Sequence, residues 1–137
     1  MSHYTQLEIE FTDGTCLKKA LEAMGFTGKI EVYNTPQNLY GYMGDLRPEK
    51  AHIIIRKRNV GMSSNDIGFE RQANGKFVAH VSEFDARPGK YDKAWFGKLK
   101  QAYTVEKTAK NVMKNGWNVF QKIKKADGTI QMVLVKN

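Results

Sequence analysis

The 137-residue chain is predicted to fold as a single α+β domain over residues 1–137, with a largely antiparallel sheet and two helical segments. Hydrophobic residues make up 41% of the sequence and charged residues 26%, so the chain can bury a core. Short alternating apolar segments indicate strands, and turns at Asn74-Gly75 and Asp127-Gly128 indicate two hairpins around the second helical segment. This element order also permits a ferredoxin-like arrangement.

The first half of the chain supplies one helix and several short strands. Strands are predicted, in chain order, over residues 4–11, 30–33, 39–42 and 51–55. A helix is expected over residues 16–24, because its apolar positions share one face, a turn with a capping residue precedes it and Gly25 follows it. Pro36 and Pro48 favour an ordered loop over residues 34–50 around the short third strand.

The hairpin turns predict which residues face each other across the strands. A two-residue Asp127-Gly128 turn places Ile123 opposite Met132, and the equivalent turn of the first hairpin places His80 opposite Phe69. With this register, one face of the last hairpin is mostly apolar, as expected of a sheet that covers a core.

A lysine-rich helix is predicted over residues 91–115. Its apolar arc changes direction by about 100° between residues 92–103 and 104–115, which favours a kink near Tyr103-Thr104. With that kink, Phe96 and Tyr103 belong to the core and the lysines lie opposite it. In one straight helix, both aromatic rings would instead lie within the lysine stripe and resemble a nucleic-acid stacking surface.

Positive charge is concentrated near the C-terminus. The chain carries a net charge of +8, and residues 91–137 alone carry ten lysines against three acids. Lysine attracts acidic partners but lacks the planar fork with which arginine recognises base edges. We therefore predict docking on an acidic macromolecule, a nucleic acid or an acidic protein, without sequence recognition. The candidate binding residues are Lys93, Lys100, Lys107, Lys110, Lys114, Lys122, Lys124, Lys125, Arg56 and Arg58.

No catalytic or cofactor motif is recognisable, so the sequence predicts a non-enzymatic protein with no cofactor or metal. His3, His52 and His80 lack metal-ligand spacing, and Cys16 is expected to be a buried apolar side chain. The segment from Gly41 to Gly44 has the glycine spacing of an RNA-binding loop but lacks its basic residues. No apolar run approaches the roughly 20 residues of a membrane span.

The chain also carries several short motifs in a recognisable order. They are Met1-Ser2-His3-Tyr4-Thr5, Leu17-Lys18-Lys19-Ala20-Leu21-Glu22-Ala23-Met24-Gly25, Asn65-Asp66-Ile67-Gly68-Phe69, Gln101-Ala102-Tyr103 and Asp127-Gly128-Thr129-Ile130. Together they resemble the uncharacterised family of plastid and cyanobacterial reading frames called "ycf thirty-five". The resemblance implies cytosolic or stromal residence and no established activity, so it assigns no functional residue. Residues 34–50 and the Ser63-Ser64 loop match none of its motifs, as expected of a divergent, for example phage-borne, relative.

Two alternatives to acidic docking stay open. A protein–protein adaptor would use a sheet edge or the aromatic residues 33–42, with the lysines serving only solubility. An enzyme of unrecognised type would need a pocket that joins His52 or His80 to a carboxylate.

Overall fold

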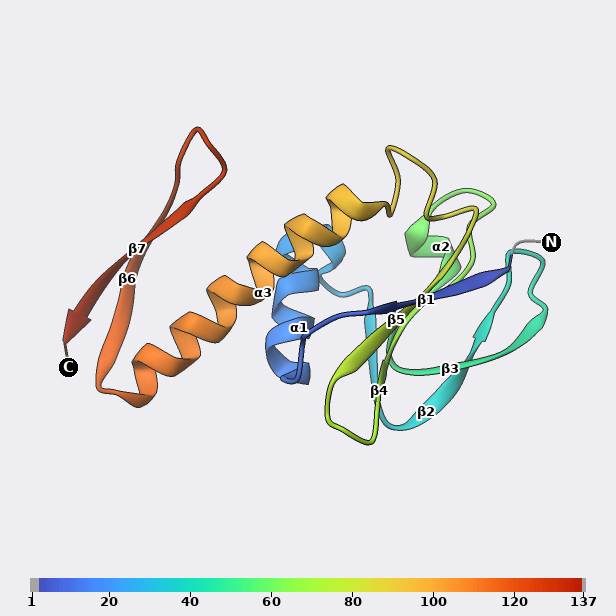
Figure 1. Ribbon diagram of the computed structural model, residues 1–137, viewed down its shortest axis with the longest axis horizontal. Coiled ribbons are helices and arrows are strands. Elements are labelled where there is room, and N and C mark those ends of the chain that lie inside the picture. Colours follow the sequence, from blue (N-terminus) through green and yellow to red (C-terminus); the bar gives the residue numbers. More distant parts are fainter. Residues whose placement is uncertain (1–2, 137) are drawn as a thin grey trace.

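The computed structural model describes residues 3–136 and confirms the predicted α+β class. Within these residues, a five-stranded and a two-stranded antiparallel sheet lie at opposite ends of the molecule, joined by the longest helix (Figure 1). The elements, in chain order, are β1 (Tyr4–Glu8), α1 (Gly14–Leu21), η1 (Glu22–Phe26, a π-helical turn), β2 (Ile30–Tyr40), β3 (Leu46–Ile55), α2 (Lys57–Val60), β4 (Ile67–Arg71), β5 (Phe77–Ser82), α3 (Lys93–Lys114), β6 (Trp117–Lys124) and β7 (Ile130–Lys136).

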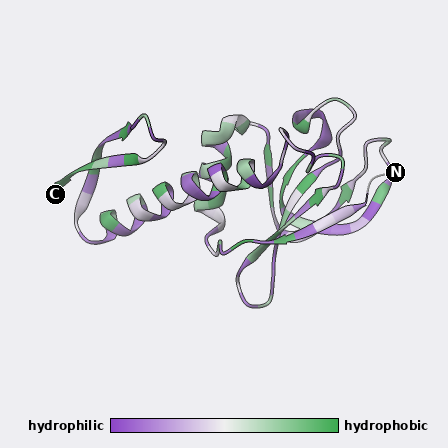
Figure 2. Ribbon diagram, turned by 45° about the horizontal axis from the view of Figure 1, so that its top comes forward, coloured by the Kyte–Doolittle hydropathy of each residue, from purple (hydrophilic) through white to green (hydrophobic). Residues whose placement is uncertain are grey.

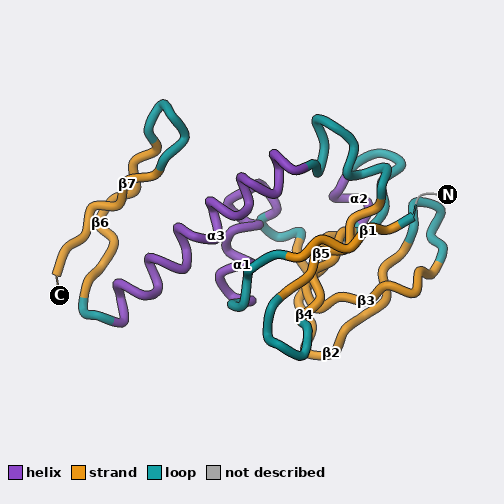
Figure 3. The backbone as a smooth tube through the Cα atoms, viewed as in Figure 1, coloured by secondary structure: helices purple, strands orange, loops and turns teal. Residues whose placement is uncertain are grey.

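The five-stranded sheet has the order β1-β5-β4-β3-β2, and all its neighbouring strands are antiparallel. Strands β2 to β5 follow one another as a meander, whereas β1 pairs with β5 and lies at one edge (Figure 3). In a ferredoxin-like sheet the first strand lies in the interior of the sheet. That predicted arrangement is therefore wrong, because α1 connects β1 at one edge to β2 at the other.

The main core lies between α1, the first half of α3 and one face of the five-stranded sheet. Asp13 caps α1 by accepting a hydrogen bond from the Cys16 N–H at 3.1 Å, which confirms a helix start close to the predicted position. The helix ends in the turn η1, where Gly25 has a φ of 105°. In Figure 2 the hydrophobic colouring is concentrated on α1 and the strands that it covers. The largest fully buried side chains of the main core include Leu17, Leu21, Ile53, Ile55, Ile67, Phe69, Phe77 and Leu99.

Helix α3 is continuous from Lys93 to Lys114, so the predicted kink is wrong. Thr104 does not cap a new helix, since its hydroxyl donates to the Lys100 carbonyl one turn earlier at 2.9 Å. The change in apolar direction has another cause: α3 packs one side on the core and turns another side, which includes Val105, toward the last hairpin. Although α3 has 22 residues, neither it nor another helix within residues 3–136 is apolar enough to cross a membrane.

The predicted core positions of Phe96 and Tyr103 in α3 are confirmed. Phe96 packs against the core, and Tyr103 is buried with its ring stacked on Phe11 at a centroid distance of 4.1 Å. The Tyr103 hydroxyl also accepts hydrogen bonds from the backbone N–H groups of Thr12 and Asp13, at 3.2 and 3.0 Å. Tyr103 is therefore not available to stack on nucleic-acid bases.

Both predicted hairpins are present, but each has a three-residue loop. Residues 73–75 read Ala-Asn-Gly and residues 126–128 read Ala-Asp-Gly. Gly75 and Gly128 have φ values of 83° and 89°, the left-handed conformation that completes such a loop after a type I turn. The loop side chains Asn74 and Asp127 each accept a hydrogen bond from the N–H two residues further on.

The longer loops shift both registers by one residue. Ile123 faces Gln131 rather than Met132, and His80 faces Gly68 rather than Phe69. Because side chains alternate along a strand, this shift moves each partner to the other face, and both predicted pairings are wrong.

Residues 34–50 form most of a long hairpin instead of the predicted loop. β2 extends to Tyr40 and β3 begins at Leu46, with irregularities in their register after Val32 and Asn38. The two prolines misled the prediction. Pro36 lies in the edge strand β2, and Pro48 lies in the part of β3 that does not pair with β4, so neither removes a hydrogen bond from the sheet interior.

Candidate functional site

The β6–β7 hairpin stands away from the main sheet on the second half of α3 (Figure 1). We call residues 104–136 the C-terminal arm. Gly116 has a φ of 85° and reverses the chain after α3, and the Gln101 side chain then donates a hydrogen bond to the Gly128 carbonyl. A groove of about 470 Å³ separates the helix from the hairpin, and Val105, Ile130 and Met132 contribute to its lining.

Apolar side chains lie on both faces of the hairpin, contrary to the predicted one-sided pattern. Ile130 and Met132 face α3 across the groove, so the alternate residues Val133 and Val135 face away from the helix. Val135 is 49% exposed, and Phe120, at the register irregularity of β6, is 72% exposed. The outer surface of the C-terminal arm therefore presents uncovered apolar side chains.

Three of the predicted binding lysines are ion-paired. The ammonium groups of Lys107 and Lys110 lie 3.4 and 2.5 Å from the Asp13 carboxylate, and that of Lys122 lies 3.4 Å from Glu106. Asp13 also caps α1, so the first two pairs fasten α3 to the start of α1. The single Asp13 carboxylate offsets one of the two positive charges where the helices meet.

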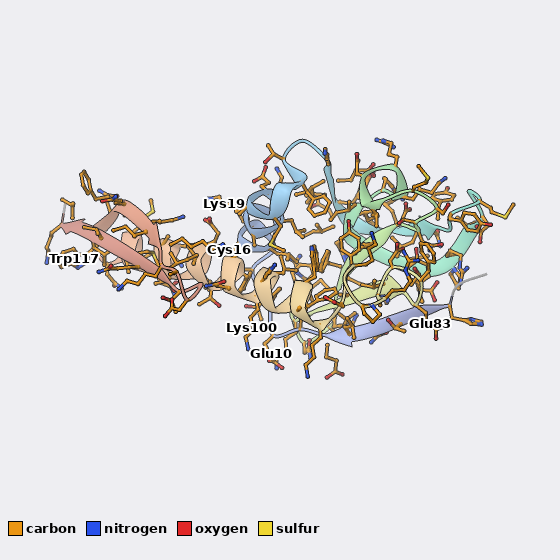
Figure 4. All side chains as sticks on the ribbon, turned by 90° about the horizontal axis from the view of Figure 1, so that it is seen from above. Glu10, Cys16, Lys19, Glu83, Lys100 and Trp117 are labelled. Atoms are coloured by element: carbon orange, nitrogen blue, oxygen red, sulfur yellow. The ribbon has the colours of Figure 1, made fainter. Side chains whose placement is uncertain are left out.

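Five other predicted lysines form no ion pair within residues 3–136: Lys93, Lys100, Lys114, Lys124 and Lys125. Lys100 nevertheless lies near Glu10, and after Lys76 its charge helps to lower the pKa of Glu10. Lys100 of α3 lines the groove. Lys124 of β6 pairs in register with the groove residue Ile130, so it lies near the same groove, close to the loop of the hairpin. Lys114 ends α3 near Trp117, whose ring lies 5.3 Å from the Lys136 ammonium. Figure 4 shows Lys100 and Trp117 well apart along the molecule. The eight predicted lysines thus divide into paired residues and separate unpaired groups.

The two predicted arginines have different surroundings. Arg56 donates to Glu31 and to the buried Asp66, each at 2.9 Å, and its side chain is only 17% exposed. Burial on its own lowers the pKa of Arg56, but the hydrogen bonds with Asp66 and Glu31 outweigh this and raise it. Arg56 therefore holds the sheet together, whereas Arg58 is exposed after it.

A buried polar cluster behind Arg56 was missed by sequence reasoning. The Asp85 carboxylate accepts from the Asn65 N–H at 2.9 Å and from the Ser82 hydroxyl at 2.8 Å, and the Asn65 amide also donates to Ser82. The Asn65 side-chain oxygen Oδ1 accepts a hydrogen bond from the Tyr42 N–H. The motif that contains Asn65 and Asp66 was visible in the sequence, but no pattern indicated its partners. Every polar group named here is hydrogen-bonded, which is typical of a structural cluster.

The histidines and the cysteine form no cluster suited to chemistry. His80 contacts Glu70 at 2.9 Å, and the Cys16 thiol is buried as predicted. Burial and then the Asp13 charge raise the pKa of Cys16, which disfavours a reactive thiolate. No group of three or more metal-ligating side chains occurs among residues 3–136.

Acid is expected to weaken the attachment of α3 to α1 through Asp13. Burial raises the pKa of Asp13, but hydrogen bonds from Lys110, the Cys16 N–H and Lys107 outweigh it and hold the pKa well below its usual value. A lowered pKa contributes stability that is present above the unfolded value and is lost as pH falls through the folded one. Asp13→Asn keeps the N-cap, so it should cost about 1 kcal/mol at pH 7 and progressively less below about pH 4.

Urea unfolding of the wild type and of D13N at neutral and acidic pH measures this difference. An equal cost of D13N at about pH 7 and about pH 2 would contradict the role of the Asp13 charge.

The two antiparallel sheets and their helices define an α+β protein. The chain belongs to the family described as "Protein of unknown function (DUF1257)", whose model matches residues 20–133. It is 26% identical over 135 residues to the uncharacterized protein ycf35 of Cyanophora paradoxa, and 23% identical over 134 residues to that of Pyropia yezoensis. Each match covers 98% of this chain and 96% of the relative, which confirms the resemblance seen in the sequence. No solved structure matches the chain.

Proposed function

We propose that this chain is a small non-enzymatic accessory protein whose C-terminal arm docks on an acidic protein surface. The main support is the combination, on one projecting hairpin, of unpaired lysines with exposed apolar side chains. Lys124 and Lys125 lie next to the hairpin loop, and Phe120 and Val135 are exposed on the same hairpin. Interfaces between proteins combine an apolar centre with a charged rim, and this surface supplies both.

The composition of the arm favours a protein over a nucleic acid as the partner. Residues 91–137 contain no arginine, so the arm lacks the side chain best suited to bidentate contacts with phosphates and bases. Tyr103, the ring within the lysine stripe, is buried against Phe11. The exposed valine of the outer face has no role in base stacking, but it suits an apolar protein surface.

Removing unpaired lysines from the arm is expected to abolish salt-sensitive binding. The test variant is the triple K114Q/K124Q/K125Q, and the matched control is K29Q/K50Q/K90Q, which makes the same change of charge on the body. Binding to polyglutamate and to duplex DNA is measured by fluorescence anisotropy at rising salt. We expect the arm variant to lose polyglutamate binding by about tenfold or more and the control by less than about twofold.

A second measurement separates the two kinds of partner. The tagged wild type, the lysine triple variant and F120D are each used to capture partners from a nuclease-treated extract of the host. A protein partner is supported if the wild type still captures its partner after nuclease treatment and if both variants capture less. Loss of capture by the wild type after nuclease treatment contradicts a protein partner. Equal losses in the arm and body triples would show general charge attraction only.

A different surface supports the adaptor alternative. The tip of the β2–β3 hairpin exposes Tyr42 (47%), Met43 (78%) and Leu46 (64%), at the end of the molecule remote from the arm (Figure 1). M43D should then reduce partner capture while K114Q/K124Q/K125Q leaves it intact.

A further inference from the structure

A polar pocket of about 370 Å³ lies in the body of the molecule, where α1 meets β2, β3 and β4. Its apolar lining comes from Val32, Ile53 and Phe77. Its polar lining comes from Thr15 and Lys18 of α1, Asn34 of β2, His52 of β3 and Arg71 of β4. No carboxylate belongs to the described lining, so its charged side chains, Lys18 and Arg71, are both positive.

The two cationic side chains of the pocket have no anionic partner among residues 3–136. Neither Lys18 nor Arg71 takes part in an ion pair there, in contrast to Arg56. The Arg71 guanidinium lies over the Phe77 ring, with its central carbon 4.8 Å from the ring centroid. A Cβ at Gly14 would lie 3.0 Å from Arg71 Nη2, so the absence of a side chain at Gly14 lets the guanidinium approach the start of α1.

His52 adds a neutral donor to this pocket. Its Nδ1 accepts a hydrogen bond from the Arg71 backbone N–H at 3.0 Å, which assigns the proton of the neutral ring to Nε2. Burial, and then the Arg71 charge, lower the pKa of His52, while Glu70 opposes them. The ring is therefore neutral at pH 7 and retains one N–H that Arg71 does not occupy.

We propose that this pocket binds a phosphate monoester whose organic part is small and apolar. The donors of Arg71, Lys18 and His52 would bind the phosphate oxygens, because a phosphate dianion accepts more hydrogen bonds than a carboxylate. Val32, Ile53 and Phe77 would contact the organic part. The pocket belongs to the body and shares no residue with the C-terminal arm, so this proposal is independent of the proposed docking function.

Titration with phenyl phosphate tests the proposal, with amide chemical shifts of the full chain as the readout. We expect saturable shifts at pocket residues, and weaker binding to inorganic phosphate and to benzoate. Arg71→Gln should weaken phenyl phosphate binding by about tenfold, because it removes a charged hydrogen-bond donor. Lys18→Gln should weaken it several-fold. Lys19→Gln, at the neighbouring exposed position of α1 (Figure 4), makes the same change outside the pocket and should leave binding within about twofold.

Each other result would overturn the proposal. Absence of saturable shifts at millimolar phenyl phosphate would show that the pocket is not a ligand site. Equal weakening by K18Q and K19Q would show unspecific attraction. Equal affinity for benzoate would overturn the choice of phosphate, and equal affinity for inorganic phosphate would overturn the apolar contact. The dispersed amide spectrum of each variant reports whether it is folded.

Discussion

Asp66→Ala is expected to lower the free energy of unfolding by about 3 to 5 kcal/mol, the usual cost of removing one partner from a buried ion pair. Asp66 is 1% exposed, and one carboxylate oxygen accepts from Arg56 at 2.9 Å and from the Tyr40 N–H at 2.7 Å. The other oxygen accepts from the Lys57 N–H at 2.7 Å. Alanine would leave two backbone donors without an acceptor, and Glu31 would be the one carboxylate still paired with Arg56 among residues 3–136.

Urea denaturation measures the loss, and Glu10→Ala is the control. Glu10 is also ion-paired, with Lys76 at 2.7 Å, but its side chain is 74% exposed, so this variant should leave the unfolding midpoint unchanged. A loss for D66A as small as that for E10A would contradict the structural role of the buried carboxylate. The double variant D66A/R56M should be less destabilised than the two single changes combined predict, because it removes both charges.

Gly68→Ala is expected to cost about 1 to 3 kcal/mol through overpacking. A Cβ at Gly68 would lie 2.5 Å from Ala51 Cβ and 2.8 Å from a Leu39 methyl carbon. Leu39 and Ala51 are fully buried in a second small core on the other face of the sheet, so they have little room to move. The glycine of the Asn65–Phe69 motif is therefore explained by close packing of neighbouring strands.

The same substitution at Gly97 should have the opposite sign. Gly97 lies in α3, and a Cβ there would meet no atom within 4 Å, so alanine should stabilise the helix by up to about 1 kcal/mol. Thermal and urea unfolding of both variants check the pair. A neutral G68A would contradict the close-packing explanation, and a destabilising G97A would show that the groove beside it needs the open space.

The sequence predicted the elements whose signals are local. The helix after Asp13, the lysine-rich helix and both glycine-containing hairpins are present, because capping, helical spacing and turn residues act within a few positions. The registers failed by one residue, since a glycine turn fits loops of two or three residues equally well. The predicted kink was wrong because helical periodicity shows which faces of a helix are apolar but does not show that two different partners cover them.

The candidate binding residues show the same limit. Lys107 and Lys110 contact Asp13, more than 90 residues earlier in the chain, so no local pattern shows that these two lysines share a carboxylate. Arg56 reaches Asp66 and Glu31 in the same way, whereas Arg58, two residues later, stays exposed. The pocket beside Arg71 is lined by residues from five elements, and none of these residues was distinguished by its spacing in the sequence. Only the contacts between residues distant in sequence show which cations are held in ion pairs and which are not.

Because α3 is continuous, the number of residues in the helix determines how the hairpin is oriented relative to the body. Each residue added to or removed from the helix after Lys110 would turn the hairpin by about 100° about the helix axis and move it by about 1.5 Å. The Asp13 contacts and the core would keep their places on the first part, while the outer lysines and Phe120 would point in a new direction. Insertions of one, two and four alanines would therefore rotate the arm in steps, with the four-residue insertion nearly restoring its original orientation.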